Sequence, residues 1–494
     1  MNNRSMPVIW QGAADVDPNS RLDSQPLHLV RAMGLAEAYD RLPAAAVRFA
    51  RRLGFKADYG SHLLLPDDQG ALVGLGSCAF ELSGGENPEP ESLAWVLGNL
   101  SLTLPAGLWH LPPETPAAAA EALVLGWLLG SYAYDRYKRV VPRVAVLVAP
   151  ACLPAERVEA LVARAAAIFM ARDLINCPAN DCGPAELAAA MEQLAQQHGA
   201  EFRQIIGDDL LVENFPLVHC VGRASAKPPR LLELTWGDPQ ARRVTLVGKG
   251  VCFDSGGLDI KPSSGMLLMK KDMGGAAAML ALAAMVMAES LQICLRLIIP
   301  AVENMIDGRA MRPSDIVTSR SGKTVEIGNT DAEGRLILAD ALTYATEGGW
   351  EEANPARPPD LLIDAATLTG AARVALGPEL PAVFSRHRAL VAEVVAAGEV
   401  AADPLWPMPL WPGYRRQLNS RFADLSSVGD SSHNGAITAA LFLAEFVPAS
   451  GPWLHIDMIA WNLSSRPGRP LGGEAQTVLA LREYLDKLVE AGVG

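Results

Sequence analysis

The sequence predicts an α/β protein with two domains: a smaller N-terminal α/β domain and a larger C-terminal domain with a mainly parallel or mixed sheet flanked by helices. Two observations lead to this prediction. From residue 177 onward, strand-like and helix-like apolar runs alternate, which is typical of a largely parallel sheet covered on both faces. The chain has 494 residues, 50% of them hydrophobic and 20% charged, so it can bury more than one large core.

The N-terminal domain is expected over residues 1–153, where short apolar runs, "GALVGLGSC" and "RVAVLVAP", surround an Ala-rich helical stretch near 116–130. Residues 154–176 predict one long helix. Pro154 stands at its start, and apolar residues at 158, 161, 165, 168 and 169 follow the spacing of one helix face. The segment "CPANDCGP" then ends the helix. We interpret it as a linker to a C-terminal domain at 177–494.

Within the C-terminal domain the expected elements follow one another closely. Strands are predicted in "RVTLVGKG", "LQICLRLIIPAV" and "PDLLIDAATLTG", and helices in "GGAAAMLALAAMVMAES" and "EGRLILADALTYATEG". Ligands of such sheets bind beyond the carboxyl ends of the strands. Polar residues that directly follow these strands are therefore the first candidates for a functional site.

The overall composition narrows the class of protein. A formal net charge of −13 argues against nucleic acid or an anionic membrane as the main partner. The seven cysteines are scattered and form no C-x-x-C pair, so neither a disulfide framework nor a structural zinc knot is expected. The N-terminus has no apolar core of signal-peptide length, and apolar runs such as 279–288 are too short to span a bilayer. We expect a cytoplasmic protein.

Charged residues gather in two stretches at predicted strand ends or helix starts. The first, "NTDAEGRL", holds Asp331, Glu333 and Arg335 immediately before an apolar helical run. The second spans residues 247–277 and is rich in glycine. It contributes four further charged candidates, Lys249, Asp254, Lys261 and Asp272. Any one of these residues alone is most simply a solvated loop charge, but both stretches fall where an α/β domain binds its ligand.

Phosphate binding fits these stretches poorly. "GKG" lacks the Ser or Thr of a P-loop, and Phe253 stands where G-x-G-x-x-G requires glycine. A metal site fits better, because crowded carboxylates repel one another unless cations compensate them. The chain has eight histidines and none lies in either stretch, so oxygen-rich ligation is expected. Carboxylates that can bridge favour a two-metal centre, with ions ~3.5–4 Å apart.

The two stretches together resemble the leucyl aminopeptidase family, the cytosolic di-metal aminopeptidases. The octapeptide matches the family signature, and the resemblance covers about residues 170–494. It includes "NCPAN", "RPSDIVTSRSGKTVEIGNTDAEGRL", "IDAATLTGA", "PLWPGYRRQLNSRFADL" and "GAITAALFLAEFV". The first 150 residues resemble the family only loosely, through "GWLLGSYAYDRYK". The implied function is that of a hydrolase, a metalloprotease that removes the N-terminal residue from peptides.

The resemblance implies a role for each charged residue. One metal ion would be bound by Lys249, Asp254, Asp272 and Glu333, and the second by Asp254, Glu333 and Asp331. Lys261 and Arg335 would be the catalytic pair: Lys261 faces the developing oxyanion, and Arg335 holds a bicarbonate ion that shuttles the proton. The implied cofactors are two divalent ions, manganese or zinc, with bicarbonate as the catalytic anion, and the implied assembly is a homohexamer.

The resemblance also implies a substrate side-chain pocket. Met269 would line it, with Thr367, Leu368 and Gly370 at its rim, and an apolar pocket would suit an N-terminal Leu or Met. Ordinary core packing is the alternative for Met269 and Leu368. Two segments depart from the family pattern, "SSHN" before Gly435 and "NLSSRPGRPLGGEA" near the C-terminus. Both could edge the pocket, which leaves the leucine preference open.

Two other function classes remain as alternatives. A di-metal phosphoesterase would usually mix histidines with its carboxylate ligands, and these stretches contain none. A catalytically weak scaffold or binding protein of the same fold would have no need to keep Lys249, Lys261 and Arg335. An aminoacyl-anilide assay with and without chelator separates the three possibilities.

Overall fold

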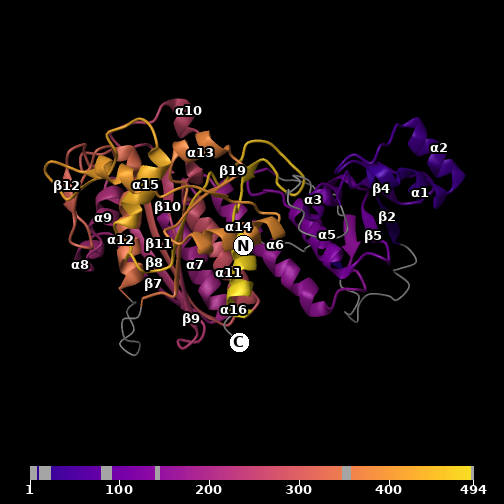
Figure 1. Cartoon of the computed structure of the whole chain (residues 1–494), viewed down its shortest axis with the longest axis horizontal. Coiled ribbons are helices and arrows are strands. Elements are labelled where there is room, and N and C mark those ends of the chain that lie inside the picture. The colour runs from indigo at the N-terminus through magenta and orange to yellow at the C-terminus, as the bar shows by residue number, and fades with distance from the viewer. Residues whose placement is uncertain (1–7, 10–23, 79–91, 139–144, 348–357, 491–494) are drawn as a thin grey trace. The chain divides into compact units, whose positions relative to one another are not determined.

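The computed structural model describes residues 8–9, 24–78, 92–138, 145–347 and 358–490. The chain divides into two compact units (Figure 1). The N-terminal unit comprises Met1–Phe169 and Ser464–Leu471, and the C-terminal unit comprises Met170–Leu463 and Gly472–Gly494. One continuous helix, α6 (Ala155–Asn176), contains the point at which the chain passes from the first unit to the second.

The N-terminal unit has a six-stranded sheet in the order β1-β6-β5-β2-β4-β3. All strand pairs are parallel except β3 with β4. The strands are β1 (Val8–Ile9), β2 (Gln25–Val30), β3 (His62–Leu64), β4 (Ala71–Gly74), β5 (Gly107–His110) and β6 (Ala145–Val148). The helices are η2 (Ala32–Gly34), α1 (Leu35–Asp40), α2 (Ala44–Arg52), α3 (Leu93–Val96), α4 (Leu100–Thr103) and α5 (Ala117–Gly130).

The C-terminal unit is built on a mixed nine-stranded sheet in the order β16-β15-β18-β14-β9-β11-β8-β7, with β10 paired to β11. The central pairs β18-β14, β14-β9, β9-β11 and β10-β11 are parallel, whereas β7, β8 and β15 run antiparallel to a neighbour. The strands are β7 (Glu201–Ile206), β8 (Arg230–Trp236), β9 (Arg242–Gly248), β10 (Gly250–Asp254), β11 (Ile293–Asn304), β14 (Leu361–Ala366), β15 (Ala382–Phe384), β16 (Trp406–Pro407) and β18 (Trp453–Asp457). The predicted two-domain α/β fold is confirmed.

The other elements of this unit are helices and two small sheets. The longer helices are α7 (Pro184–His198), α11 (Gly274–Ala288), α12 (Glu333–Thr346), α14 (Arg388–Val400), α15 (Gly435–Ala444) and α16 (Val478–Glu490). The shorter ones are α8 (Asp209–Val212), α9 (Pro216–Gly222), α10 (Ser263–Met266), η3 (Met269–Met273), η4 (Thr330–Ala332), α13 (Gly370–Leu376) and η5 (Pro412–Leu418). The small sheets are β12 (Ile316–Thr318), β13 (Thr324–Glu326) and β17 (Leu425–Ser426), and β19 (Trp461–Asn462) with β20 (Gly472–Gly473).

Helices α11 and α12 pack on the two faces of strand β9, because successive residues of a strand point to opposite faces. Val247 belongs to the core around α12, whereas a Cβ atom on Gly248 would lie 2.5 Å from Cα of Ala276 in α11. Gly275 permits an equally close approach, since its Cβ would lie 2.1 Å from the carbonyl oxygen of Ala365. These glycines let α11 begin directly against the carboxyl ends of the strands.

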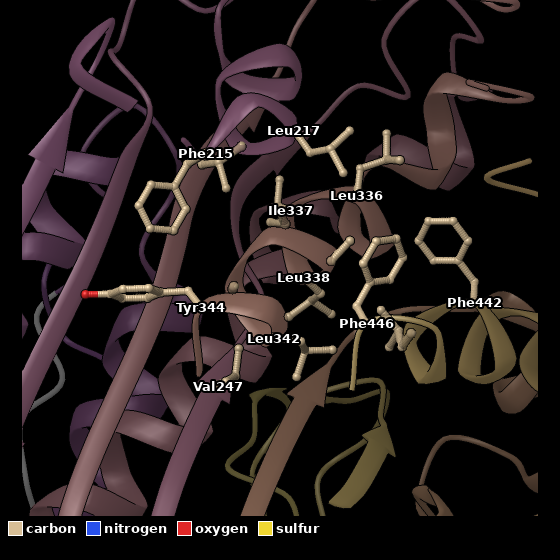
Figure 2. Packing of buried hydrophobic residues seen from close by; sticks show 14 of the residues in the cluster. Phe215, Leu217, Val247, Leu336, Ile337, Leu338, Leu342, Tyr344, Phe442 and Phe446 are labelled. Atoms are coloured by element: carbon tan, nitrogen blue, oxygen red, sulfur yellow. The ribbon is translucent and has the colours of Figure 1, made fainter. Parts of the chain in front are cut away.

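The largest described core of this unit surrounds α12. Figure 2 shows Leu336, Ile337, Leu338, Leu342 and Tyr344 packed with aromatic side chains from neighbouring segments, all of them buried. The ring of Phe215 meets that of Tyr344 edge-on, with centroids 5.1 Å apart. Because α12 directly continues the octapeptide of the sequence analysis, this packing fixes the position of Glu333 at its first turn.

The apolar helical segment around α11 is longer than the sequence analysis expected. Together η3 and α11 form a helical stretch, Met269–Ala288, that by length and composition alone could cross a membrane. However, 94% of the apolar window is buried inside the fold. The sheet and α16 both pack against α11, and a helix covered on several sides is apolar around its whole circumference.

Candidate metal centre and substrate pocket

A pocket of about 480 Å³ opens at the carboxyl ends of the parallel strands. Lys249 directly follows β9, Asp254 ends β10, and Thr367 follows β14. Asp272 lies in η3, and Glu333 is the first residue of α12. Of the eleven site residues predicted from the sequence, ten line this pocket: Lys249, Asp254, Lys261, Met269, Asp272, Asp331, Glu333, Thr367, Leu368 and Gly370.

Three buried carboxylates form the centre of the site. One oxygen from each of Asp254, Asp272 and Glu333 lies within 4.8 Å of the others, and all three residues are at most 3% exposed. Oε2 of Glu333 is buried and has no hydrogen-bond partner among the described residues. Hard and borderline divalent cations prefer such oxygen donors, so the donor set fits a metal centre.

Lys249 reaches into this cluster from the end of β9. Its Nζ lies 2.8 Å from Oδ2 of Asp272 and 3.0 Å from Oε1 of Glu333, and it donates a hydrogen bond of 2.9 Å to the carbonyl oxygen of Thr367. A side chain at Gly334 would obstruct it, because a Cβ there would lie 2.5 Å from Cε of Lys249. This contact explains the glycine between Glu333 and Arg335 in the octapeptide.

Lys261 approaches the cluster from the loop after β10. Its Nζ lies 2.8 Å from Oδ2 of Asp254 and also contacts Oδ1 of Asp331. Asp331 is the most exposed of the four acidic candidates, with 32% of its side chain accessible. The site therefore has a buried half, with Lys249 between Asp272 and Glu333, and a more open half, with Lys261 between Asp254 and Asp331.

Burial and mutual repulsion shift the protonation of these groups. Burial, and next to it the other carboxylates, raise the pKa of Asp254 and of Glu333 above the usual range. Burial by itself would lower the pKa of Lys249, but the charges of Asp272, Glu333 and Asp254 outweigh it and raise that pKa. Cations within the cluster would reverse both directions, favouring ionised carboxylates and a neutral lysine amine.

Arg335 follows Glu333 by two residues in α12 and does not line the pocket. It is buried, with 8% exposure, and its Nη1 donates a hydrogen bond of 2.7 Å to the carbonyl oxygen of Ser427. Nε has no partner among the described residues. Burial lowers the pKa of Arg335, while Glu333 and Asp457 act in the opposite direction.

One residue that orients the cluster was not singled out from the sequence, and Thr367 was singled out only for the rim of the pocket. Asn304, the last residue of β11, donates hydrogen bonds of 2.9 Å to Oδ1 of Asp254 and 3.0 Å to the carbonyl oxygen of Thr330. Thr367 Oγ1 donates 2.7 Å to Oδ1 of Asp272. The position of Asn304 at the end of a buried strand was the only available signal. Such outer contacts fix the direction in which a metal ligand points.

The wall of the pocket combines predicted and additional residues. Met269, Thr367, Leu368 and Gly370 share the pocket with apolar residues that the sequence analysis did not name: Pro262, Leu268, Pro378, Leu380, Pro381, Met458 and Ile459. Neither of the two unusual segments, residues 431–434 and 462–475, contributes to the lining among the described residues. Ser464–Leu471 instead belongs to the N-terminal unit, where the Gly468 amide donates to the Gly98 carbonyl oxygen at 3.0 Å.

The fold and this site fit a metal-dependent aminopeptidase, and comparison with known proteins identifies the family. Residues 169–481 match the model of the cytosol aminopeptidase family, catalytic domain, and residues 25–150 match that of the M17 aminopeptidase N-terminal domain. The chain belongs to the cytosol aminopeptidase family. The family resemblance inferred from the sequence is thereby confirmed, and now extends to the N-terminal unit.

Individual relatives agree with this assignment. A probable cytosol aminopeptidase of Syntrophotalea carbinolica is 40% identical over 447 residues, which cover 86% of each chain. The crystal structure of the cytosol aminopeptidase from Coxiella burnetii is 42% identical, with a TM-score of 0.87 over 98% of this chain and 99% of that one. The bottromycin maturation enzyme BotP in complex with Mn is 35% identical, with a TM-score of 0.82 over 94% of this chain and 100% of that one.

Proposed function

We propose that the enzyme uses two divalent ions, Mn²⁺ or Zn²⁺, to release apolar N-terminal residues such as Leu or Met from peptides. In this proposal Lys249, Asp254, Asp272 and Glu333 bind one ion, and Asp254, Glu333 and Asp331 bind the other. The observation that carries it is the convergence of three buried carboxylates with Lys249 in one pocket. The Mn complex of the relative BotP supports manganese as one candidate.

Two bound ions would lower the pKa of a shared water, polarise the scissile carbonyl and hold the free α-amine that distinguishes a peptide terminus from an internal bond. Asp254 and Glu333 are the proposed bridging ligands because the resemblance to the family assigns both of them to each ion, and both are buried within the cluster. Lys249 can ligate only as a neutral amine, so it must lose its proton when a cation binds.

Lys261 is the proposed electrostatic catalyst. Its ammonium lies on the open side of the cluster, and an ammonium aimed at the scissile carbonyl oxygen stabilises the negative charge that develops there. Arg335 is proposed to hold a bicarbonate ion that receives and returns the proton. Its Nε is buried and has no hydrogen-bond partner among the described residues, which supports this role.

The proposed preference for apolar N-terminal residues rests on the pocket wall. Met269 and Leu368 line it together with Leu380 and Met458. A hydrophobic wall of this kind discriminates by only ~1–3 kcal/mol for each methylene, so related apolar residues should all be accepted. Location in the cytoplasm and assembly as a hexamer are further parts of the proposal, supported by the names and the resemblance of the family.

The decisive assay compares three substrates before and after chelation. Leucine p-nitroanilide should be hydrolysed, hydrolysis should stop after prolonged chelation, and Mn²⁺, Zn²⁺ or Co²⁺ should restore it. p-Nitrophenyl phosphate tests the phosphoesterase alternative, and an N-acetylated leucine anilide tests the need for a free amine. Full activity in a sample verified to be metal-free, or equal activity on the acetylated substrate, would contradict the proposal.

A further inference from the structure

The substrate pocket contains one buried cation that the proposed chemistry does not use. Lys271 lines the pocket, is only 6% exposed, and follows Met269 by two residues in η3. Among the described residues its side chain has no hydrogen-bond or ion-pair partner. Its backbone amide donates to the carbonyl oxygen of Leu268, and its carbonyl oxygen accepts from the amide of Gly274. Burying an unpaired ammonium is unfavourable, so a substrate group that compensates it is the natural expectation.

The nearby carboxylates are already engaged with other donors. Asp272 accepts a hydrogen bond from Thr367 on Oδ1 and contacts Lys249 through Oδ2. Asp457 accepts hydrogen bonds from the amide of Leu368 on Oδ1 and from the Thr369 hydroxyl on Oδ2. Among the described residues, no hydrogen bond or ion pair joins either acid to Lys271, although the charge of Asp272 acts on its ammonium. Lys271 therefore lacks a direct partner, which a substrate carboxylate would supply.

A second cation strengthens the positive charge on the same wall. Arg373 lines the pocket from α13, and its charge acts on the ammonium of Lys271. Lys271 shares η3 with Met269, and Arg373 shares α13 with Gly370, so the two cations belong to the two elements that carry the proposed side-chain pocket. The positive charge is therefore positioned for the side chain of the N-terminal residue.

We propose that Lys271 binds the side-chain carboxylate of an N-terminal glutamate or aspartate, so that the enzyme releases acidic residues as well as apolar ones. Met269 and Leu368 contact the methylene groups, and the ammonium receives the carboxylate at the end of the pocket. N-terminal Lys and Arg are disfavoured, because their charge repels Lys271. This specificity rests on the proposed aminopeptidase function and deepens it.

The test uses aminoacyl-p-nitroanilides of Glu and its neutral isostere Gln, with Leu as reference. These substrates carry no C-terminal carboxylate, so the only carboxylate that can reach Lys271 is on the side chain. In the unmodified enzyme, kcat/KM for Glu should exceed that for Gln by about 10- to 100-fold, the usual worth of a hydrogen bond to a charged group. Using the ratio cancels any general change in metal content or turnover.

Three variants refine the result. Lys271→Met should bring the Glu/Gln ratio close to one, and Lys271→Arg should retain most of it. Lys270→Met is the matched control: the neighbouring ammonium donates to the carbonyl oxygen of Asn176 at 2.6 Å and is not part of the pocket lining, so the ratio should not change.

The outcomes separate this proposal from the function on which it rests. If Leu is not hydrolysed by the unmodified enzyme, the aminopeptidase function itself fails. If Leu is hydrolysed but Glu is no better than Gln, the proposal for Lys271 is overturned, whatever the variants do. The proposal is also overturned if Lys271→Met lowers kcat/KM for Leu-Gly but not for Leu-Gly amide and leaves the Glu/Gln ratio unchanged. Lys271 would then bind the C-terminal carboxylate of the substrate.

Discussion

Replacing Gly334 by alanine should move Lys249 out of the metal cluster. The added Cβ would lie 2.5 Å from Cε, 2.7 Å from Nζ and 2.8 Å from Cδ of Lys249. The lysine cannot yield freely, because Nζ is held by Asp272, Glu333 and the carbonyl of Thr367. Overpacking of this kind costs ~1–3 kcal/mol, which outweighs the ~0.5–1 kcal/mol that alanine normally gains over glycine in a helix.

The assay is a comparison of melting temperatures in chelator, so that metal binding does not contribute. Gly334→Ala should lower the melting temperature of the C-terminal unit by roughly 2–8 °C. In the Lys249→Ala background the obstruction is gone, and the same substitution should instead be neutral or stabilising. Equal destabilisation in both backgrounds would refute the reasoning, because it would show that the glycine serves something other than room for Lys249.

Three further predictions follow from the site and its supports. Arg335→Ala should retain its metals but lose its response to added bicarbonate, whereas Lys261→Ala should keep that response and lose ~10²–10³ in kcat. If Arg335→Ala responds to bicarbonate like the unmodified enzyme, Arg335 does not bind the anion. Asp340→Asn should destabilise the fold by ~1–3 kcal/mol. The two carboxylate oxygens of Asp340 accept hydrogen bonds from the backbone amides of Leu217 and Arg320 at 2.7 and 2.8 Å, and the side-chain nitrogen of asparagine cannot accept one of them. Urea unfolding identical to that of the unmodified enzyme would contradict this prediction. Light scattering should report a hexamer, and a monomer at working concentration would remove that part of the proposal.

Local sequence patterns were sufficient to predict the fold class and the two charged stretches, whereas the resemblance to the family supplied the pocket residues Met269, Thr367, Leu368 and Gly370. Polar residues that follow apolar strands meet at one edge of a parallel sheet, which is why Lys249 and Asp254 could be expected at one site. Glu333, at the start of a helix, was added to them by the octapeptide motif. The apolar stretch preceding Glu289 was harder to interpret. The helical stretch that contains it, Met269–Ala288, is long and apolar enough to cross a membrane, and its burial inside the fold accounts for its apolar composition.

Features that depend on long-range contacts could not be predicted. Asp340 reads as one polar residue on a helix, yet it is fully buried and accepts amides from two distant segments. In the sequence Lys271 is one of two adjacent lysines. Nothing there indicates that Lys271 lines the pocket and Lys270 does not. Arg335 was grouped with the catalytic residues by its motif, and its hydrogen bond to the carbonyl oxygen of Ser427, 92 residues away in the sequence, could not be predicted.

Metal stoichiometry tests the central claim most directly. Elemental analysis of the purified enzyme should find two divalent ions per chain. Asp254→Ala and Glu333→Ala, which remove proposed bridging ligands, should each lose more than one equivalent, whereas Asp272→Ala, which removes a ligand of one ion, should lose about one. If Asp254→Ala and Glu333→Ala lose no more metal than Asp272→Ala, the proposed bridged two-metal centre is wrong.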